Sequence, residues 1–173
     1  MIRNCFIIFM FVLVGGGYFI CEAEDYFGGK TDQVVVYTGV GVQGNLELLS
    51  IFNIFYSQRN KFFRLQGRQN FELLGLFGKD TYKKYNCLVA GLSQDVIIPV
   101  YKGLFIGTGL GIFISNKKTD RVSSNFTFGE KIFVGIKCNN EVIELLGRHF
   151  SNGDLTGKNK GYNFVGIAVV HIF

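Results

Sequence analysis

Apolar and polar residues alternate with a period of two along most of the chain from about residue 32 onward. The clearest case is residues 103–115, where the even positions are aliphatic apart from Thr108 and the odd positions are glycine, phenylalanine and serine. Residues 33–43 show the same division into two unlike faces. Side chains on a strand point alternately to opposite sides of a sheet, so this pattern predicts strands whose two faces meet different surroundings.

Polar clusters divide the alternating segments into eight predicted strands, at about 33–43, 45–57, 68–78, 84–94, 101–115, 123–138, 141–151 and 162–173. An even number of antiparallel strands closes into a barrel with both chain ends on one side. In an outer-membrane barrel that side is the periplasm, which makes the connections near 44, 79–83, 116–122 and 152–161 external. The periplasmic connection expected at 58–67 is longer than such turns usually are.

The character of the two faces favours a barrel that lies in a membrane. The aliphatic face of 103–115 suits contact with lipid, and its face of small residues suits a narrow, filled interior. A soluble lipocalin-like barrel, which would turn aliphatic residues inward and charges outward, is the alternative fold. The chain ends in Phe173, preceded on the same strand face by Val165, Ile167 and Val169, an ending typical of outer-membrane barrels. We therefore expect an all-β fold, an eight-stranded antiparallel outer-membrane β-barrel.

The first 23 residues are expected to be a cleaved secretory signal peptide. Arg3 precedes an apolar run from Phe6 to Ile20, and Cys21-Glu22-Ala23 ends on a small residue. This run is shorter than the roughly 20 apolar residues that a spanning helix needs. An uncleaved N-terminal anchor is the alternative. The expected organisation is a signal peptide over 1–23 and a β-barrel domain over 24–173, located in the cell outer membrane.

Charge and cysteine content narrow the partners. The 173-residue chain has a net charge of +5, and removing the signal peptide takes one charge of each sign, Arg3 and Glu22, so the net charge is unchanged. No basic nucleic-acid-binding module is visible, and anionic lipid head groups are the natural partner of an exported basic barrel. Cys87 and Cys138 have no CxxC partner or neighbouring histidine. They are expected to be unpaired thiols, and no metal site or cofactor is predicted.

The candidate chemistry lies in the last two predicted strands. His149 and Ser151 are two residues apart on one strand, so they share its outward face near the external end. Strand parity counted back from Phe173 places Asn163 on the same face of the neighbouring strand. In this arrangement Ser151 would attack a carbonyl, His149 would take its proton, and Asn163 would fix the imidazole tautomer. Donors for the resulting oxyanion are expected from Asn152, Asn159 and the backbone around Gly153.

Four motifs in the last part of the chain carry a family resemblance: Gly107-Thr108-Gly109-Leu110-Gly111, Phe126-Thr127-Phe128-Gly129-Glu130, His149-Phe150-Ser151-Asn152 and Asn159-x-Gly161-x-Asn163. Through them the chain resembles, from Gly107 to Phe173, the PagL-type lipid A 3-O-deacylases, an outer-membrane family that includes acyloxyacyl-hydrolase-like proteins. The resemblance implies an eight-stranded barrel with a serine-esterase site on its outer surface. The implied reaction releases an ester-linked 3-hydroxyacyl chain from lipid A.

Position by position, the resemblance implies Ser151 as the nucleophile, His149 as the base and Asn152 as part of the oxyanion hole. Asn159 would belong to the supporting loop. The family has a glutamate at the position of Asn163 in this chain. Asparagine can still orient a histidine, but it has no charge to offset the imidazolium, and the corresponding Asp to Asn change in a serine protease lowers kcat about 10⁴-fold.

Three acids are the candidates to replace the missing glutamate: Glu130, Glu144 and Asp154. Glu144 is expected to face the barrel interior together with Arg148, where opposite charges four residues apart can join a polar network. Asp154 lies in the predicted external connection at 152–161. The residues alone therefore do not decide which of the three, if any, serves the histidine.

Basic residues in the predicted external connections fit a phosphorylated lipid, with solvated loop charge as the alternative interpretation. These candidates for binding the lipid A phosphates are Lys79, Lys83, Lys84, Lys117, Lys118, Arg121, Lys158 and Lys160. Two other functions are open, a non-catalytic small barrel that acts as an adhesin or stabilises the membrane, and an acyltransferase that passes the chain to a second lipid. The expected partners are lipid A or lipopolysaccharide and outer-membrane lipid, without nucleic acid, and a homodimer is left open.

Overall fold

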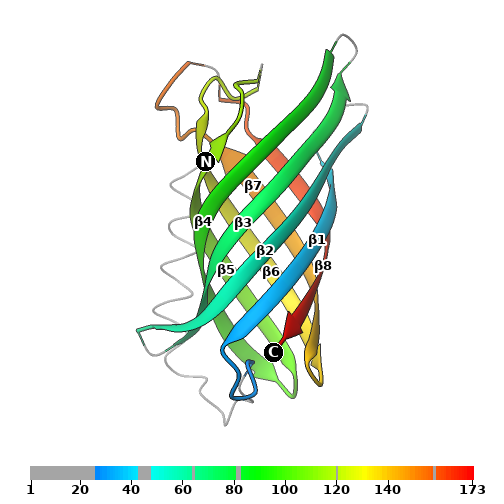
Figure 1. Cartoon of the computed structure of the whole chain (residues 1–173), viewed down its shortest axis with the longest axis vertical. Helices are drawn as coiled ribbons and strands as arrows, with labels where there is room; N and C mark the ends of the chain where they lie inside the picture. Colours follow the sequence, from blue (N-terminus) through cyan, green and yellow to red (C-terminus); the bar gives the residue numbers. More distant parts are fainter. Residues whose placement is uncertain (1–25, 43–47, 64, 81–82, 120, 158) are drawn as a thin grey trace.

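Eight antiparallel strands form a closed barrel in the computed structural model of the chain, which confirms the predicted fold class (Figure 1). The structure describes residues 26–42, 48–63, 65–80, 83–119, 121–157 and 159–173, so the predicted signal peptide at 1–23 lies outside the described residues. No described segment is a helix long and apolar enough to cross a membrane. The strands are β1 (Asp32–Gly41), β2 (Leu48–Phe62), β3 (Leu65–Asp80), β4 (Lys83–Tyr101), β5 (Leu104–Ser115), β6 (Phe126–Cys138), β7 (Glu141–Ser151) and β8 (Tyr162–Ile172).

Each strand pairs with its neighbour in sequence, and β8 pairs with β1 to close the barrel. The C-terminus lies at the lower end of the barrel in Figure 1, close to the start of β1. Because successive strands reverse direction, the β5–β6 and β7–β8 connections, residues 116–125 and 152–161, both lie at the upper end (Figure 1). This is the end at which the sequence places the candidate residues.

The prediction of a long lower connection at 58–67 is wrong, because most of its residues belong to β2 and β3. β2 continues to Phe62 and β3 begins at Leu65, with Gln58 opposite Gln69 in the ladder. Phe63 has a φ of 56°, the left-handed conformation that a tight hairpin turn requires. β2, β3 and β4 are longer than predicted because strands of a barrel continue past its apolar zone, where polar residues satisfy the same ladder.

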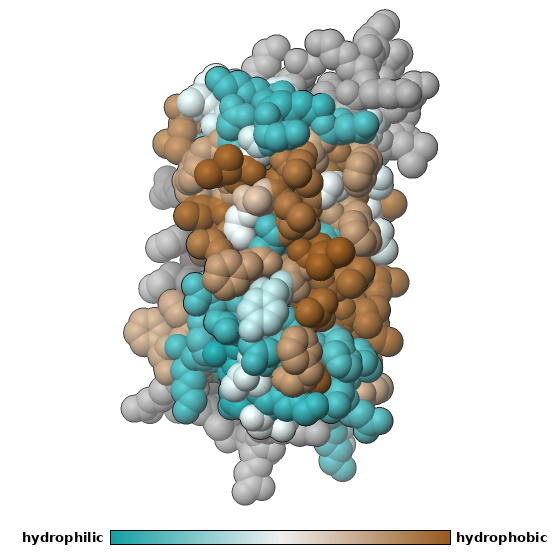
Figure 2. Space-filling model, viewed as in Figure 1, coloured by the Kyte–Doolittle hydropathy of each residue, from teal (hydrophilic) through white to brown (hydrophobic). Residues whose placement is uncertain are grey.

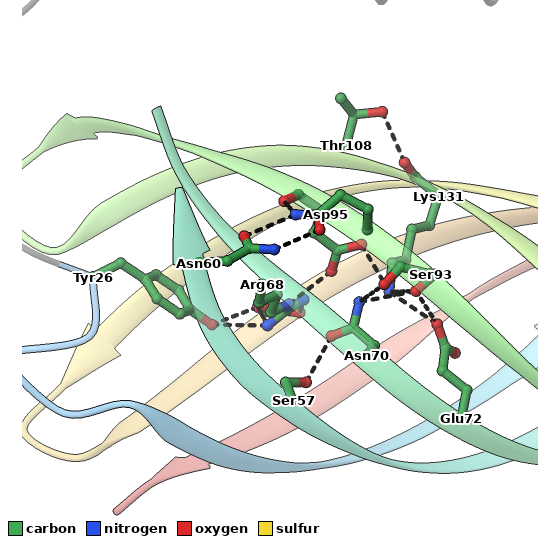
Figure 3. A network of polar contacts seen from close by, with 12 residues as sticks. Tyr26, Ser57, Asn60, Arg68, Asn70, Glu72, Ser93, Asp95, Thr108 and Lys131 are labelled. Atoms are coloured by element: carbon green, nitrogen blue, oxygen red, sulfur yellow. Dashed lines mark hydrogen bonds and ion pairs between the residues drawn. The ribbon is translucent and has the colours of Figure 1, made fainter. Parts of the chain in front are cut away.

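Side chains of opposite charge fill the barrel interior and neutralise one another (Figure 3). Arg68 on β3 is fully buried, and its Nε donates to Asp95 Oδ2 at 2.7 Å. Its Nη1 and Nη2 atoms donate to the two carboxylate oxygens of Glu144 at 2.8 Å and 2.9 Å, and Nη1 also reaches the Tyr26 hydroxyl at 2.9 Å. A buried guanidinium is tolerated only with this degree of pairing.

A second ionic group lies higher on the same strand, around Glu72. Its carboxylate oxygens lie 3.2 Å from Lys131 Nζ and 2.6 Å from an Arg148 Nη2, and Asn53 donates to it at 2.8 Å. Lys131 Nζ also lies 3.0 Å from Asp95 Oδ1, which links the two groups. Glu144 and Arg148 thus both join the interior network, as predicted, through different partners. Buried rings fill the remaining space, among them Phe55, Phe105, Phe113 and Phe133.

On the face seen in Figure 2, the outer surface of the barrel is mainly apolar over its middle and hydrophilic at both ends. Large hydrophobic side chains are exposed at alternate positions of the strands, including Val36, Ile54, Leu110, Ile112, Ile132, Leu145 and Ile167. A water-soluble barrel would bury such residues, whereas a barrel in lipid exposes them. The surface therefore favours the membrane barrel over the lipocalin-like alternative.

Candidate active site

The candidate residues gather at the upper ends of β7 and β8. β7 alternates as its sequence predicts, with Glu144 and Arg148 buried in the interior and Leu145 and His149 on the outward face. The register of the two strands sets His149 directly opposite Asn163. Segment 152–161 connects the strands just above this pair (Figure 1). The site is thus built from one hairpin and its loop.

His149 and Asn163 are in direct contact, since Nδ1 of the imidazole lies 2.7 Å from Asn163 Oδ1. An amide oxygen only accepts hydrogen bonds, so in this arrangement Nδ1 of the neutral ring carries the proton and Nε2 keeps its lone pair. A histidine in that tautomer can take a proton from a neighbouring hydroxyl through Nε2. The pair therefore has the geometry of a general base with its orienting partner.

Gly161 makes room for the imidazole. A Cβ on Gly161 would lie 2.7 Å from His149 Cε1 and 2.9 Å from the carbonyl oxygen of Phe150. Gly161 also has a φ of 62°, in the left-handed region that favours glycine. The sequence shows Gly161 only as one member of a motif, and its steric role under the histidine was missed.

Ser151 is the last residue of β7 and lies on the same side of the strand as His149. It is only 6% exposed, although it was expected on the open outer surface. Ser151 lines a groove of about 670 Å³ that crosses the outside of β4, β5 and β6. The groove is mainly apolar, with walls that include Leu92, Leu110, Ile112, Phe128 and Leu155. Such a groove can hold a hydrocarbon chain with its carbonyl end beside the hydroxyl.

Asn152 and Asn159 shape the loop that follows Ser151. The Nδ2 atom of Asn152 donates to the Thr156 carbonyl at 2.7 Å, and its Oδ1 accepts the Asp154 N–H at 3.1 Å. Asn159 Oδ1 accepts the backbone N–H of Asn152 at 3.0 Å. The side chains of both asparagines expected as oxyanion donors are therefore engaged in hydrogen bonds within the loop. Gly153, which lines the groove next to Ser151 with a φ of 62°, keeps its backbone N–H as the candidate oxyanion donor.

Hydrogen bonds tie the two upper loops together. Arg121 in the β5–β6 connection donates from Nε to the Gly161 carbonyl at 2.8 Å, and its carbonyl accepts the Lys160 N–H at 2.8 Å. Val122 forms a β-bridge with Asn159, and Ser123 Oγ donates to the Thr156 carbonyl at 2.9 Å. Arg121 was expected only as a phosphate ligand. Its hydrogen bond to Gly161, beside His149, has no signal in the sequence because Arg121 and Gly161 are 40 positions apart.

Three of the predicted phosphate-binding lysines occupy the same end of the barrel. Lys117 and Lys118 in the β5–β6 connection and Lys160 in the β7–β8 connection are exposed, while Lys158 lies outside the described residues. Within the described part of the chain, no group of three His, Cys, Asp or Glu side chains is arranged to hold a metal ion. Cys87 is buried, Cys138 is exposed, and both are free thiols.

Comparison with known proteins places this geometry in context. The sequence model of the lipid A 3-O-deacylase (PagL) family matches residues 77–171, more than half of the chain, and includes every strand of the candidate site. The crystal structure of the outer membrane enzyme PagL superposes with a TM-score of 0.61 at 14% identity, covering 82% of this chain and 99% of that one. The Yersinia pestis outer membrane protein Ail superposes with a TM-score of 0.52 at 12% identity and the same coverage. At these low identities, the two superpositions show a similar fold and nothing more. No curated protein matches the sequence.

Proposed function

Because this chain belongs to the lipid A 3-O-deacylase (PagL) family, we propose that it is an outer-membrane serine esterase that releases an ester-linked 3-hydroxyacyl chain from lipid A. The observation that carries the proposal is the 2.7 Å contact of His149 with Asn163 on the strand face that also bears Ser151, beside an apolar groove. Ester hydrolysis at a lipid surface requires an oriented imidazole as base, a hydroxyl as nucleophile and a site for the hydrocarbon chain.

The proposed reaction proceeds through an acyl-enzyme. Ser151 Oγ attacks the ester carbonyl while His149 Nε2 takes the hydroxyl proton, and the Gly153 N–H stabilises the oxyanion of the tetrahedral intermediate. Collapse breaks the bond to the sugar oxygen, which leaves with the proton from Nε2. Water then attacks the acyl-serine and gives a proton to His149, which passes it to Ser151 Oγ as the free fatty acid is released. Asn163 holds Nδ1 throughout both halves of the reaction.

The position of the site supports a substrate that is itself part of the membrane. Ser151 is the last residue of β7, at the upper end of that strand, and it lines a mainly apolar groove on the outside of the barrel. In lipid A the ester bonds join acyl chains to sugars, so they lie where hydrocarbon meets head group. The acyl chain would lie in the groove, and the phosphates would meet Lys117, Lys118 and Lys160. Export of the barrel would use the signal peptide expected at 1–23.

Incubation of the purified barrel with lipopolysaccharide, followed by mass spectrometry of released 3-hydroxy fatty acid, tests this function. Wild type should release the acid and Ser151→Ala should release none. Ser50→Ala is the matched control, because Ser50 is another outward-facing serine, on β2. Release that persists unchanged in Ser151→Ala, or no release by wild type, would rule out the proposal. Gain of the acyl chain by an added phospholipid instead of water would identify an acyltransferase.

A non-catalytic barrel is the second candidate, and the neutral Asn163 at the position of the family's glutamate is the observation that favours it. In that case the His149–Asn163 contact and the loop hydrogen bonds would serve only to stabilise the last hairpin. Urea unfolding in detergent separates the two candidates. Lower stability of both His149→Ala and Ser151→Ala, together with no esterase activity of wild type, would support the structural role.

A further inference from the structure

We propose that Glu130 offsets the positive charge that His149 acquires during the reaction, a task that the neutral Asn163 leaves open. The inference rests on the proposed esterase function and deepens it, because it assigns a positioning residue that acts through the base. The acid comes from β6, on the side of His149 opposite to Asn163.

The register of the barrel brings Glu130 to the histidine. Glu130 on β6 is the direct cross-strand partner of His149 on β7, just as Asn163 is its partner on β8. Side chains of directly opposite residues lie on the same face of the sheet, with Cβ atoms about 4.5–5.5 Å apart. Glu130 is half-buried and lines the groove together with Ser151 and Gly153. Glu130 therefore lies opposite His149 in the ladder and shares the groove with Ser151.

Glu130 has apolar neighbours on its own strand, and its carboxylate has no positively charged partner among the described residues. Its outward neighbours on β6 are Phe128 and Ile132, which are exposed on the apolar outer surface of the barrel. The interior acids Glu72, Asp95 and Glu144 all form ion pairs, whereas the side chain of Glu130 has no hydrogen bond or ion pair within the described residues. A carboxylate on the lipid-facing side of a barrel is costly, so an unpaired one there indicates a functional role.

The geometry defines how Glu130 acts. His149 Nδ1 is engaged with Asn163 Oδ1, and the ring lies against Gly161 at the β8 side, so Glu130 stabilises the imidazolium through its field and not as the hydrogen-bonding orienter. Arg148, the neighbour of His149 in sequence, is buried in the interior and pairs with Glu72, and the upper loops carry further charges. Arg121 and Lys160 are cations, which oppose a second positive charge, and Asp154 is held by Asn159 in the loop. Glu130 is the acid placed to counter them.

A double-mutant cycle with a substrate-independent readout tests the proposal. Folded wild type, Glu130→Gln, Asn163→Glu and the double variant are reacted in detergent with a fluorophosphonate probe. In that reaction Ser151 Oγ bonds to phosphorus, fluoride leaves, and the serine proton passes to His149. Glu130→Gln should lower the labelling rate of Ser151 about tenfold to 100-fold with Asn163 present, the size expected for loss of a nearby unit charge. With Glu at 163 the same change should cost less than about threefold, because the acid is then supplied from β8.

Two control variants separate charge from packing. Glu130→Asp keeps the charge and should retain a labelling rate within about threefold of wild type. Glu141→Gln removes the carboxylate opposite the chain's second histidine, His171, at the lower end of β7, and should leave the labelling of Ser151 unchanged. Equal losses for Glu130→Asp and Glu130→Gln, or a Glu130→Gln loss of the same size with Asn or Glu at 163, would overturn the proposal.

The outcomes also separate this inference from the proposed function. Labelling that depends on Glu130 without release of fatty acid from lipopolysaccharide would reject the substrate and keep the role of Glu130. Deacylation that Glu130→Gln leaves within about twofold of wild type would keep the function and reject the role. A wild-type barrel and an Asn163→Glu variant that both fail to label Ser151 would overturn the role of Glu130, since no active base would be present for it to assist.

Discussion

His149 Nδ1 lies 2.7 Å from Asn163 Oδ1, between residues that face each other directly across β7 and β8. This contact fixes the ring and its tautomer without supplying charge. In a serine hydrolase the orienting group does both, and the two contributions are normally inseparable because one carboxylate provides them. Here the position of the orienting group is retained and its charge is absent, so the two contributions can be measured separately.

Asn163→Glu should raise the proposed esterase activity. The carboxylate would accept the same Nδ1 proton and also stabilise the imidazolium, and loss of such a charge lowers kcat about 10⁴-fold in a serine protease. We expect a kcat gain of about tenfold to 10³-fold, smaller than that limit because Glu130 already contributes. Release of 3-hydroxy fatty acid from lipopolysaccharide measures it. A gain under about twofold would show that the charge at 163 does not limit the reaction.

Gly161→Ala should abolish most of the activity of a folded barrel. The new Cβ would lie 2.7 Å from His149 Cε1 and 2.9 Å from the backbone oxygen of Phe150, so the imidazole must move. A displacement of about 1 Å in an active site can cost about 10²-fold in rate. Gly29→Ala is the matched control, because Gly29 also has a positive φ, 83°, but nothing lies within 4 Å of its Cβ position. Equal activity of the two variants would exclude the steric role of Gly161.

Strand parity explains why so much of the fold and half of the site were predictable. Which side of a strand a residue faces depends only on counting along the chain, so the inward Glu144 and the shared outward face of His149 and Asn163 followed from alternation. Position across the sheet depends on register, which no local pattern encodes. Glu130 is 19 residues from His149 in sequence, and their pairing became visible only in the closed barrel.

Polarity was a poor guide where strands extend beyond the apolar wall. The segment 58–67 has the composition of a loop, yet the backbone of residues 58–62 and 65–67 continues the ladder between β2 and β3. The loop contacts of Arg121 were also hidden, because hydrogen bonds to a backbone carbonyl such as that of Gly161 leave no mark on the acceptor's side chain. Long-range contacts of this kind come from the way the closed barrel brings its loops together.

Arg68→Met should destabilise the barrel severely. It would leave Asp95 without its guanidinium partner and the fully buried Glu144 with only the Tyr26 hydroxyl as a described partner. Removing one member of a buried ion pair costs about 3–5 kcal/mol in the free energy of unfolding. Urea unfolding in detergent micelles measures the change, with the exposed Lys117→Met as a control expected within about 0.5 kcal/mol of wild type. A cost for Arg68→Met below about 1 kcal/mol would mean that the interior network reorganises around the loss.

Arg121→Ala should lower activity without changing the stability of the barrel. The guanidinium donates to the Gly161 carbonyl at 2.8 Å and lies 5.7 Å from the Tyr162 ring centroid, and the Cβ position of Gly161 borders the His149 ring. Loss of this tie should reduce kcat about threefold to 30-fold through looser placement of the imidazole. Arg121→Lys keeps the charge but not the planar donor and should resemble Arg121→Ala. Full activity of Arg121→Lys would assign the residue to electrostatics instead.

The exposed lysines of the upper loops should set the affinity for phosphorylated lipid and leave the chemistry unaffected. Lys117, Lys118 and Lys160 are exposed in the two upper connections, and a basic residue near an anionic lipid surface contributes about 1 kcal/mol. Changing all three to Gln should therefore raise KM for lipid A about tenfold to 100-fold with kcat within about twofold. The effect should shrink at high salt and vanish with dephosphorylated lipid A, because only screened charge interactions are lost. A lower kcat with unchanged KM would place these lysines in the folding of the loops rather than in substrate binding.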